Sequence, residues 1–183
     1  DSLSVQIASE LPTRSYNLQI RLKSLTGEVV AGYESTILLQ PGGREYLHIP
    51  LAALSSSISP TRHLIEVVLH KGRDVLAEGV CYFVPPCRLK LPDPEFSYQV
   101  TGADGVFQLE LNAKSLVKEF EIRIDGMQGT LSDNFFDLVP GKPRKVQIAV
   151  AGLKTAAELQ NRLRFRDLTR VMETTPTQRP QEK

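Results

Sequence analysis

Two pairs of carboxylates are the residues whose type and spacing come nearest to catalysis, because hydrolysis of a glycosidic bond uses two carboxyl groups that face each other. Asp133 and Asp137 lie close together, and so do Glu119 and Glu121. We interpret neither pair as catalytic. Glu119 and Glu121 alternate with apolar residues, which is typical of a solvated strand face. Asp133 and Asp137 flank a turn, where a carboxylate caps backbone N–H groups or accepts a surface or interdomain hydrogen bond.

The histidines and cysteines form no recognisable metal-binding or nucleophilic motif. His48, His63 and His70 fall in separate strand-like segments without Cys, Asp or Glu at ligand spacing, so we interpret them as exposed or edge residues. A polyproline-like path from Cys81 to Cys87 spans roughly 19 Å, well beyond the ~7 Å Cα separation that a disulfide tolerates. We therefore expect two free, partly buried thiols. The sequence predicts no catalytic residue, no metal ligand and no cofactor.

Composition excludes several classes of partner. The 183 residues carry a formal net charge of +1, so no strong field attracts nucleic acid or anionic lipid. No apolar run approaches the length of a membrane span, and no signal peptide opens the sequence. The first residue is Asp1, which we interpret as the start of a processed product or an excised fragment. The chain is long enough for one large or two small domains.

The hydrophobic pattern is that of short strands separated by turns. In the first half we expect strands at 16–22, 29–39, 46–49, 64–69 and 75–84, with a hairpin turn at 71–74. In the second half we expect strands at 96–100, 105–111, 120–124, 129–136, 144–150 and 163–168, a hairpin turn at 102–105, and short helical turns at 114–118 and 154–161. This pattern predicts an all-β protein built from two tandem antiparallel immunoglobulin-like β-sandwiches.

A proline-rich segment separates the two halves. Four prolines between residues 85 and 94 cannot join a central sheet, so we place the domains at 1–86 and 87–172. Residues 173–183 contain no apolar side chain, and we expect them to form a disordered tail.

One turn occurs in both halves. Leu39-Gln40-Pro41-Gly42, followed by Leu47 and Ile49, corresponds through a single shift to Leu138-Val139-Pro140-Gly141, followed by Val146 and Ile148. This correspondence indicates a duplicated sandwich.

Aromatic residues give only weak support for sugar binding. Platforms that stack on sugar rings use exposed Trp or Tyr, and the sequence contains no Trp. Tyr33, Tyr46, Tyr82 and Tyr98 lie in strand patterns, where we expect core or half-core roles.

An arginine stripe marks the last expected strand. Arg162, Arg164 and Arg166 alternate with Leu163 and Phe165, which predicts three guanidinium groups on one face. The simpler interpretation is a charged outer face that prevents unwanted strand pairing. The alternative is that these arginines dock on an acidic surface of a neighbouring domain, which makes them candidate interdomain contacts.

Residues 132–141 combine two turns with an apolar stretch. Ser132, Asp133 and Asn134 can bond their own backbone, and Pro140-Gly141 provides a second turn. The large apolar side chains between the turns, which belong to Phe135, Phe136 and Leu138, cannot share one face of an extended segment. We therefore predict a structural corner.

This corner resembles the Asp-Asn-(Phe/Tyr)-Phe-Asp-Leu-x-Pro-Gly signature in the C-terminal immunoglobulin-like domain of beta-mannosidases of glycoside hydrolase family two. The matching residues are Asp133, Asn134, Phe135, Phe136, Asp137, Leu138, Pro140 and Gly141. Residues 89–93 resemble the linker before that domain, and the first half is similar to the immunoglobulin-like domain that precedes it. The Arg-rich final strand and residues 155–159 have no clear counterpart.

The resemblance implies a non-catalytic accessory segment that packs against and supports the catalytic barrel of the same polypeptide. Catalytic residues of that family lie on a (β/α)8 barrel of ~250 residues, which this sequence does not contain. It also implies a location outside the cytosol, in the periplasm, the medium or the lysosome. Two alternatives stay open: an independent extracellular interaction or carbohydrate-binding module, and a small enzyme with a site built from scattered residues.

Overall fold

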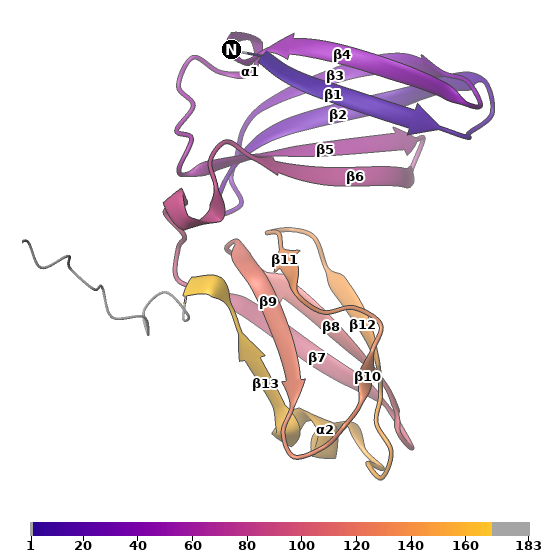
Figure 1. Cartoon of the computed structure of the whole chain (residues 1–183), viewed down its shortest axis with the longest axis vertical. Coiled ribbons are helices and arrows are strands. Elements are labelled where there is room, and N and C mark those ends of the chain that lie inside the picture. The colour runs from indigo at the N-terminus through magenta and orange to yellow at the C-terminus, as the bar shows by residue number, and fades with distance from the viewer. Residues whose placement is uncertain (1, 170–183) are drawn as a thin grey trace, which may run out of the picture. The chain divides into compact units, whose positions relative to one another are not determined.

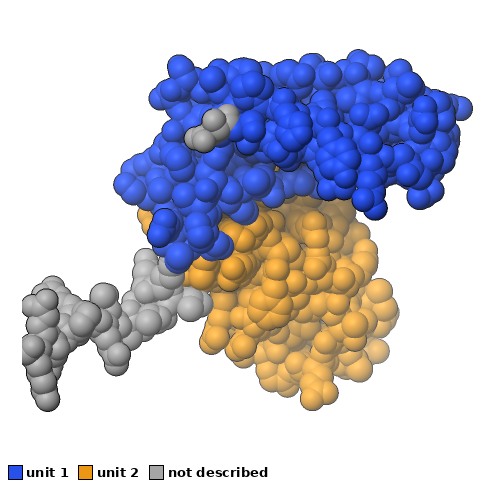
Figure 2. All heavy atoms as spheres, turned by 45° about the horizontal axis from the view of Figure 1, so that its top comes forward, with its two compact units in different colours: residues 1–90 blue, residues 91–183 orange. Residues whose placement is uncertain are grey.

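The structure is a computed structural model that describes residues 2–169. It divides into two compact units, residues 1–90 and 91–183 (Figure 2). This division falls within the proline-rich segment, a few residues after the boundary at 86/87 that the sequence analysis proposes. Each unit is all-β and antiparallel in its described residues, which confirms the predicted fold class.

The first unit places a four-stranded sheet against a two-stranded one (Figure 1). Its elements are β1 (Ser2–Ser9), β2 (Arg14–Ser24), β3 (Val29–Leu39), β4 (Gly43–Pro50), α1 (Leu51–Leu54), β5 (His63–Lys71), β6 (Asp74–Tyr82) and the short 3-10 helix η1 (Pro86–Arg88). The sheet orders are β3-β2-β5-β6 and β1-β4. Apolar side chains that alternate along β2, including Leu18, Ile20 and Leu22, form the centre of the core.

The second unit places a four-stranded sheet against a three-stranded one (Figure 1). Its elements are β7 (Phe96–Ala103), β8 (Val106–Ala113), β9 (Val117–Ile124), β10 (Thr130–Leu131), β11 (Phe136–Leu138), β12 (Arg144–Ala149), α2 (Ala156–Arg162) and β13 (Leu163–Arg166). The orders are β10-β12-β8-β7 and β11-β9-β13. Phe107, Leu109 and Leu111 from β8 meet Phe120 and Ile122 from β9 in the core.

Two hairpins confirm the expected turns. Lys71 and Asp74 pair at the end of the β5–β6 hairpin, and Gly72 has φ +59°. Asp104 and Gly105 have φ values of +50° and +84°, which is the pattern of a type I′ turn. The second turn therefore connects β7 directly to β8.

The Pro-Gly turns join corresponding strands of the two units. Residue 41 follows β3 and precedes β4, whereas residue 140 follows β11 and precedes β12. Strand β4 then pairs with β1, and β12 pairs with β8. The turn thus occupies the same place in the strand order of both units, while the duplication itself stays a prediction.

Three sequence expectations are wrong, and each has a local cause. Residues 114–118 are not helical, because Ser115 Oγ donates to Asp93 O (2.8 Å) and accepts from Glu95 N (2.9 Å), and Val117 opens β9. Residues 129–136 form two short strands instead of one, because the chain turns at 132–135. Strand β1 is absent from the predicted strands, although Leu3, Val5 and Ile7 alternate with polar or small residues.

Gly102 tests how tightly the β7–β8 hairpin is packed. Its φ is +105°, and a Cβ there would overlap the carbonyl oxygen of Val106. We expect Gly102→Ala to lower the free energy of unfolding of the second unit by about 3 kcal/mol, since the backbone must shift. Gly141 has φ +79°, and a Cβ there would have nothing within 4 Å, so Gly141→Ala is a matched control. It should cost only about 1 kcal/mol in urea unfolding, and equal losses would contradict this packing.

Candidate functional site

The side-chain amide of Asn134 holds the predicted corner together. Its Oδ1 accepts from Ile122 N at 2.8 Å, and its Nδ2 donates to Ile122 O at 3.0 Å. Phe136 pairs with Phe120 in the β11–β9 ladder, so position 134 lies where the backbone would next pair with Ile122. The side chain replaces that backbone pairing, which satisfies both polar groups of Ile122 while the main chain turns away.

Ion pairs flank the corner on both sides. Asp133 forms an ion pair with Arg144 and also accepts from Asn134 N at 2.9 Å. Asp137 accepts from Lys118 Nζ at 2.9 and 3.0 Å and from Glu119 N at 3.0 Å. The two carboxylates therefore serve as hydrogen-bond acceptors for the fold, as the sequence analysis interprets them.

Asp137 also stabilises an irregularity in β9. Glu119 has φ +54°, and the register between β11 and β9 shifts between Phe136 and Leu138. Glu119 is exposed at this point, and Glu121 is partly buried. Glu121 pairs with Arg123 at 2.6 Å, but its side chain is only 15% exposed, so the predicted solvated face describes Glu119 and not Glu121.

Phe135 is the most unusual residue of the corner. Its backbone has φ +59°, and its side chain is 68% exposed. A left-handed conformation costs a non-glycine residue about 1–2 kcal/mol. Neither the conformation nor the exposure improves packing within the unit, and such strained residues concentrate at functional sites.

Phe136 and Leu138 point into the unit, on the other side of the corner. The Phe136 ring lies 6.0 Å from that of Phe120, and the Arg144 guanidinium lies 4.9 Å from the Phe136 ring. Leu138 is buried in the core. The motif therefore anchors itself through these two side chains and presents Phe135 outward.

The arginines occupy a different part of the second unit. Arg162 ends α2 and does not belong to β13, so the predicted stripe of three arginines on one strand is wrong. Helix α2 begins with a capping box between Thr155 and Glu158, which is a signal that the alternation of apolar residues obscured. Arg164 and Arg166 do lie in β13, where they pair with Arg123 and Glu121 of β9.

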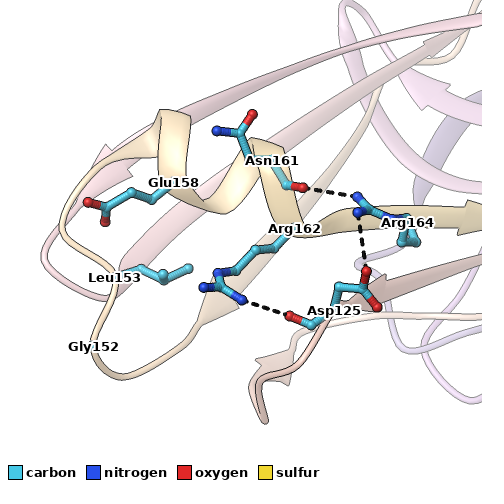
Figure 3. Close-up of a pocket in the computed structure, with 7 residues that line it drawn as sticks. All are labelled: Asp125, Gly152, Leu153, Glu158, Asn161, Arg162 and Arg164. Carbon is cyan, nitrogen blue, oxygen red and sulfur yellow. Dashed lines mark hydrogen bonds and ion pairs between the residues drawn. The ribbon is translucent and has the colours of Figure 1, made fainter.

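Arg162 and Arg164 line a polar cavity of about 590 Å³ (Figure 3). Arg162 Nη1 donates to Asp125 O at 3.2 Å, and Arg164 Nη2 forms an ion pair with Asp125 Oδ2 at 3.2 Å. Arg164 Nη1 also donates to Asn161 O at 3.0 Å. Glu158, the other acid in the cavity, accepts from Lys154 N at 2.7 Å in the helix cap. The charges of this cavity are thus engaged in local structure.

Other candidate residues remain dispersed. Among residues 2–169, no three His, Cys, Asp or Glu side chains lie together in a way that could hold a metal ion. His48 is exposed, and His63 and His70 are partly buried in different parts of β5. No helix in the described part of the chain is long and apolar enough to cross a membrane.

Two expectations about burial are wrong. Cys81 and Cys87 are free, as predicted, but both are exposed. Cys81 lies on edge strand β6, and Cys87 lies in η1. Tyr46 is 58% exposed because Leu47 and Ile49 take the inward positions of β4, and its hydroxyl accepts from Gln6 Nε2 at 3.1 Å. Tyr33, Tyr82 and Tyr98 are partly buried, as expected.

Sequence reasoning identified the residues of the corner but missed their partners. Lys118, Ile122 and Arg144 lie far from the motif in sequence or on other strands, and no local pattern connects them to it. Apolar and polar residues alternate along β9 except between Val117 and Phe120, where two polar residues follow each other. This break was the one local sign of the irregularity at Glu119.

Comparison with known proteins assigns the second unit. Residues 91–171 match the family of mannosidase Ig-fold domains. The resemblance seen in residues 132–141, which lie within this range, is therefore confirmed for the second unit. A search of curated proteins finds no match.

Two solved enzymes share the fold. The chain is similar to a beta-D-mannosidase from Dictyoglomus thermophilum, with a TM-score of 0.66 and 16% identity over 84% of this chain and 18% of that chain. It is also similar to an exo-chitosanase from Amycolatopsis orientalis, with a TM-score of 0.53 and 14% identity over 90% of this chain and 24% of that chain. The chain thus spans a quarter or less of each enzyme, and at these identities the likeness concerns the fold.

Asn134 provides a test of the corner. We expect Asn134→Asp to lower the free energy of unfolding of the second unit by about 2 kcal/mol, since Ile122 O loses its donor and meets a negative charge. Asn161→Asp is the control, because Asn161 is an exposed residue of the same unit. Urea unfolding and exchange of the Ile122 amide measure the effect. Equal stability of the two variants would contradict a supporting role for Asn134.

Proposed function

We propose that this chain is a non-catalytic accessory segment of a beta-mannosidase-like glycoside hydrolase, in which it packs against and supports the catalytic barrel of the same polypeptide. The observation that carries the proposal is Phe135, an exposed aromatic side chain held in a strained conformation within a mannosidase-type Ig-fold domain. The fold likeness to two sugar hydrolases that are several times longer supports the same role.

Phe135 has the properties of an interdomain anchor. Its position is fixed in advance by the Asn134 amide, so little conformational freedom is lost when it docks. The Asp133–Arg144 pair lies beside it and supplies a charged rim, which is the usual surrounding of an aromatic contact residue. We assign it to an apolar recess on the barrel.

The arginines are a second candidate contact. Arg164 is bound to Asp125 and to backbone carbonyls, whereas Arg166 is exposed at the end of β13. Arg162 and Arg164 shape the end of the unit, and Arg166 offers a guanidinium to an acidic partner surface. Phe135 remains the stronger candidate for an anchor, because its ring is presented outward by a left-handed backbone that costs free energy.

The assignment implies that the activity lies outside this chain. Carboxylates at the corner and in the arginine-lined cavity are paired with cations or used in a helix cap. The complete polypeptide would hydrolyse beta-mannosides outside the cytosol, in the periplasm, the medium or the lysosome. The chain itself would bind neither nucleic acid nor membrane and would need no cofactor.

Replacing Phe135 in a polypeptide that contains the barrel tests the proposal. Asn tolerates the left-handed region, so Phe135→Asn should leave the free energy of unfolding of the isolated chain unchanged or raise it by about 1 kcal/mol. In the polypeptide with the barrel, loss of an aromatic anchor should weaken docking by about 2 kcal/mol. The half-life of aryl beta-mannoside hydrolysis at raised temperature should therefore fall, while the KM stays the same.

Val106→Asn is the matched control. Val106 is 65% exposed in the same unit but has ordinary strand geometry, so this change should leave the half-life unaltered. If Phe135→Asn and Val106→Asn have equal half-lives, Phe135 does not dock on the barrel. If the isolated chain hydrolyses the mannoside, or if it binds mannan in a titration, the assignment gives way to the enzyme or the carbohydrate-binding alternative.

A further inference from the structure

Strand β1 of the first unit has a partner on one edge only. Within residues 2–169 it pairs with β4, and these two strands form a separate sheet opposite the four-stranded one. The backbone groups along the second edge of β1 therefore face outward, as they do at the end of any sheet. An unpaired edge of this kind is a template for another strand.

An apolar groove runs between this edge and β6. Its volume is about 400 Å³, and its walls are residues 3–8 of β1 and 77–81 of β6. Leu18, Val67 and Leu69 line it as well. The open edge of β1 thus borders apolar side chains that belong to the inner face of the other sheet.

Small residues keep the β6 side of the groove shallow. Ala77 and Gly79 are the cross-strand partners of Leu69 and Val67, so they share the inner face with these side chains. All of Ala77, Gly79 and Cys81 are exposed, and a Cβ placed on Gly79 would have nothing within 4 Å. An extended chain could approach this face closely.

The second unit shows what occupies the corresponding position there. Strand β7 pairs with β8 on the edge opposite β12. Its inward rings cover the facing sheet: Phe96 lies 5.6 Å and Tyr98 lies 4.9 Å from the ring of Phe165 on β13. The hairpin turn at Asp104-Gly105 connects β7 directly to β8.

The registers make β1 and β8 equivalent. Leu3 pairs with Ile49, and Val5 pairs with Leu47. Phe107 pairs with Ile148, and Leu109 pairs with Val146. Because Leu47 and Ile49 correspond to Val146 and Ile148 in the duplicated turn, Leu3 corresponds to Phe107 and Val5 to Leu109.

From this equivalence we infer that the open edge of β1 and the adjoining groove receive an antiparallel strand that enters through a tight turn from the N-terminal side of β1. Its inward positions carry apolar side chains, as β7 does with Phe96, Tyr98 and Val100. The predicted tail at 173–183 lies outside the described residues. The inference does not depend on the proposed function.

A grafted strand tests this inference. A copy of residues 96–105 is placed directly before Ser2, in place of Asp1, so that its Asp-Gly turn and register match those of β7 and β8. With Cys87→Ser, Cys81 is the only thiol, and it lies on the groove. We expect the copy to slow alkylation of Cys81 by at least about tenfold, because the reagent must then wait for local opening.

The control carries the same copy with Tyr98→Pro and Val100→Pro, since proline cannot pair within a sheet. Its Cys81 should react as fast as in the unextended chain. Equal alkylation rates with the two copies would overturn the inference. Slower alkylation of the unextended chain at high concentration, together with a dimer in gel filtration, would also overturn it, because a second copy would then fill the groove.

Hydrogen exchange gives an independent readout. The native copy should protect amides of β1 that exchange quickly in the unextended chain. Gly79→Arg fills the groove and should remove this protection, whereas Gly32→Arg should not. Gly32 is a glycine on β3, the opposite edge strand of the same sheet, and a Cβ there meets only Ile20 O at 3.7 Å. Protection that is absent, or that survives Gly79→Arg, contradicts a strand in the groove.

Discussion

The bond between the Asn134 side chain and the backbone of Ile122 is the interaction on which the second unit's corner depends. The N–H and C=O groups of β9 that face β11 need hydrogen-bond partners. At Ile122 the backbone of β11 cannot supply them, because the chain turns away before Phe136. The amide of Asn134 resolves this conflict, because it carries a donor and an acceptor in the spacing of a peptide group. Asp137 does the same for the neighbouring Glu119 N–H. With both edge groups satisfied by side chains, the backbone is free to adopt the left-handed conformation at Phe135.

The same requirement accounts for the organisation of both units. In the second unit, β7 and β10 lie at the ends of one sheet, and side chains complete the edge of the other. In the first unit, β1 and β4 pair as β8 and β12 do, and β3, β2 and β5 lie in the same order as β11, β9 and β13, yet β1 keeps an open edge beside a groove. The same Pro-Gly turn and the same pairing register after it occur in both units. The difference at β1 is therefore informative, since the strands around this turn can be compared residue by residue.

Sequence patterns predicted most of the fold because most of it is local. The strand at 29–39 has the predicted bounds, since alternation and flanking turns define it at both ends. Helix α2 followed from composition, but Arg162 was assigned to the next strand because alternation with Leu163 and Phe165 continues across the helix end. Segment 114–118 was misassigned because Ser115 forms hydrogen bonds with Asp93 and Glu95, which precede β7 and lie about 20 residues earlier in the sequence.

The candidate site divides along the same line. The turns of the corner were recognisable in the sequence, since Asp, Asn and Pro-Gly favour turns. The left-handed backbone of Phe135 was not recognisable in the sequence. It accompanies the hydrogen bonds between Asn134 and Ile122, and Ile122 belongs to another strand, β9. Exposure of Phe135 likewise emerges only when Phe136 and Leu138 have taken the inward positions. Local turn preferences determine where the corner lies, and contacts between strands determine that Phe135 is its exposed side chain.

Photo-cross-linking from position 135 shows directly whether this residue docks on the catalytic barrel. With p-benzoylphenylalanine in place of Phe135, in a polypeptide that includes a catalytic barrel, irradiation should join this position to peptides of that barrel, as identified by mass spectrometry. The same amino acid at Val106 should give few such products. The account is contradicted if position 135 yields no barrel cross-links, or no more than position 106 does.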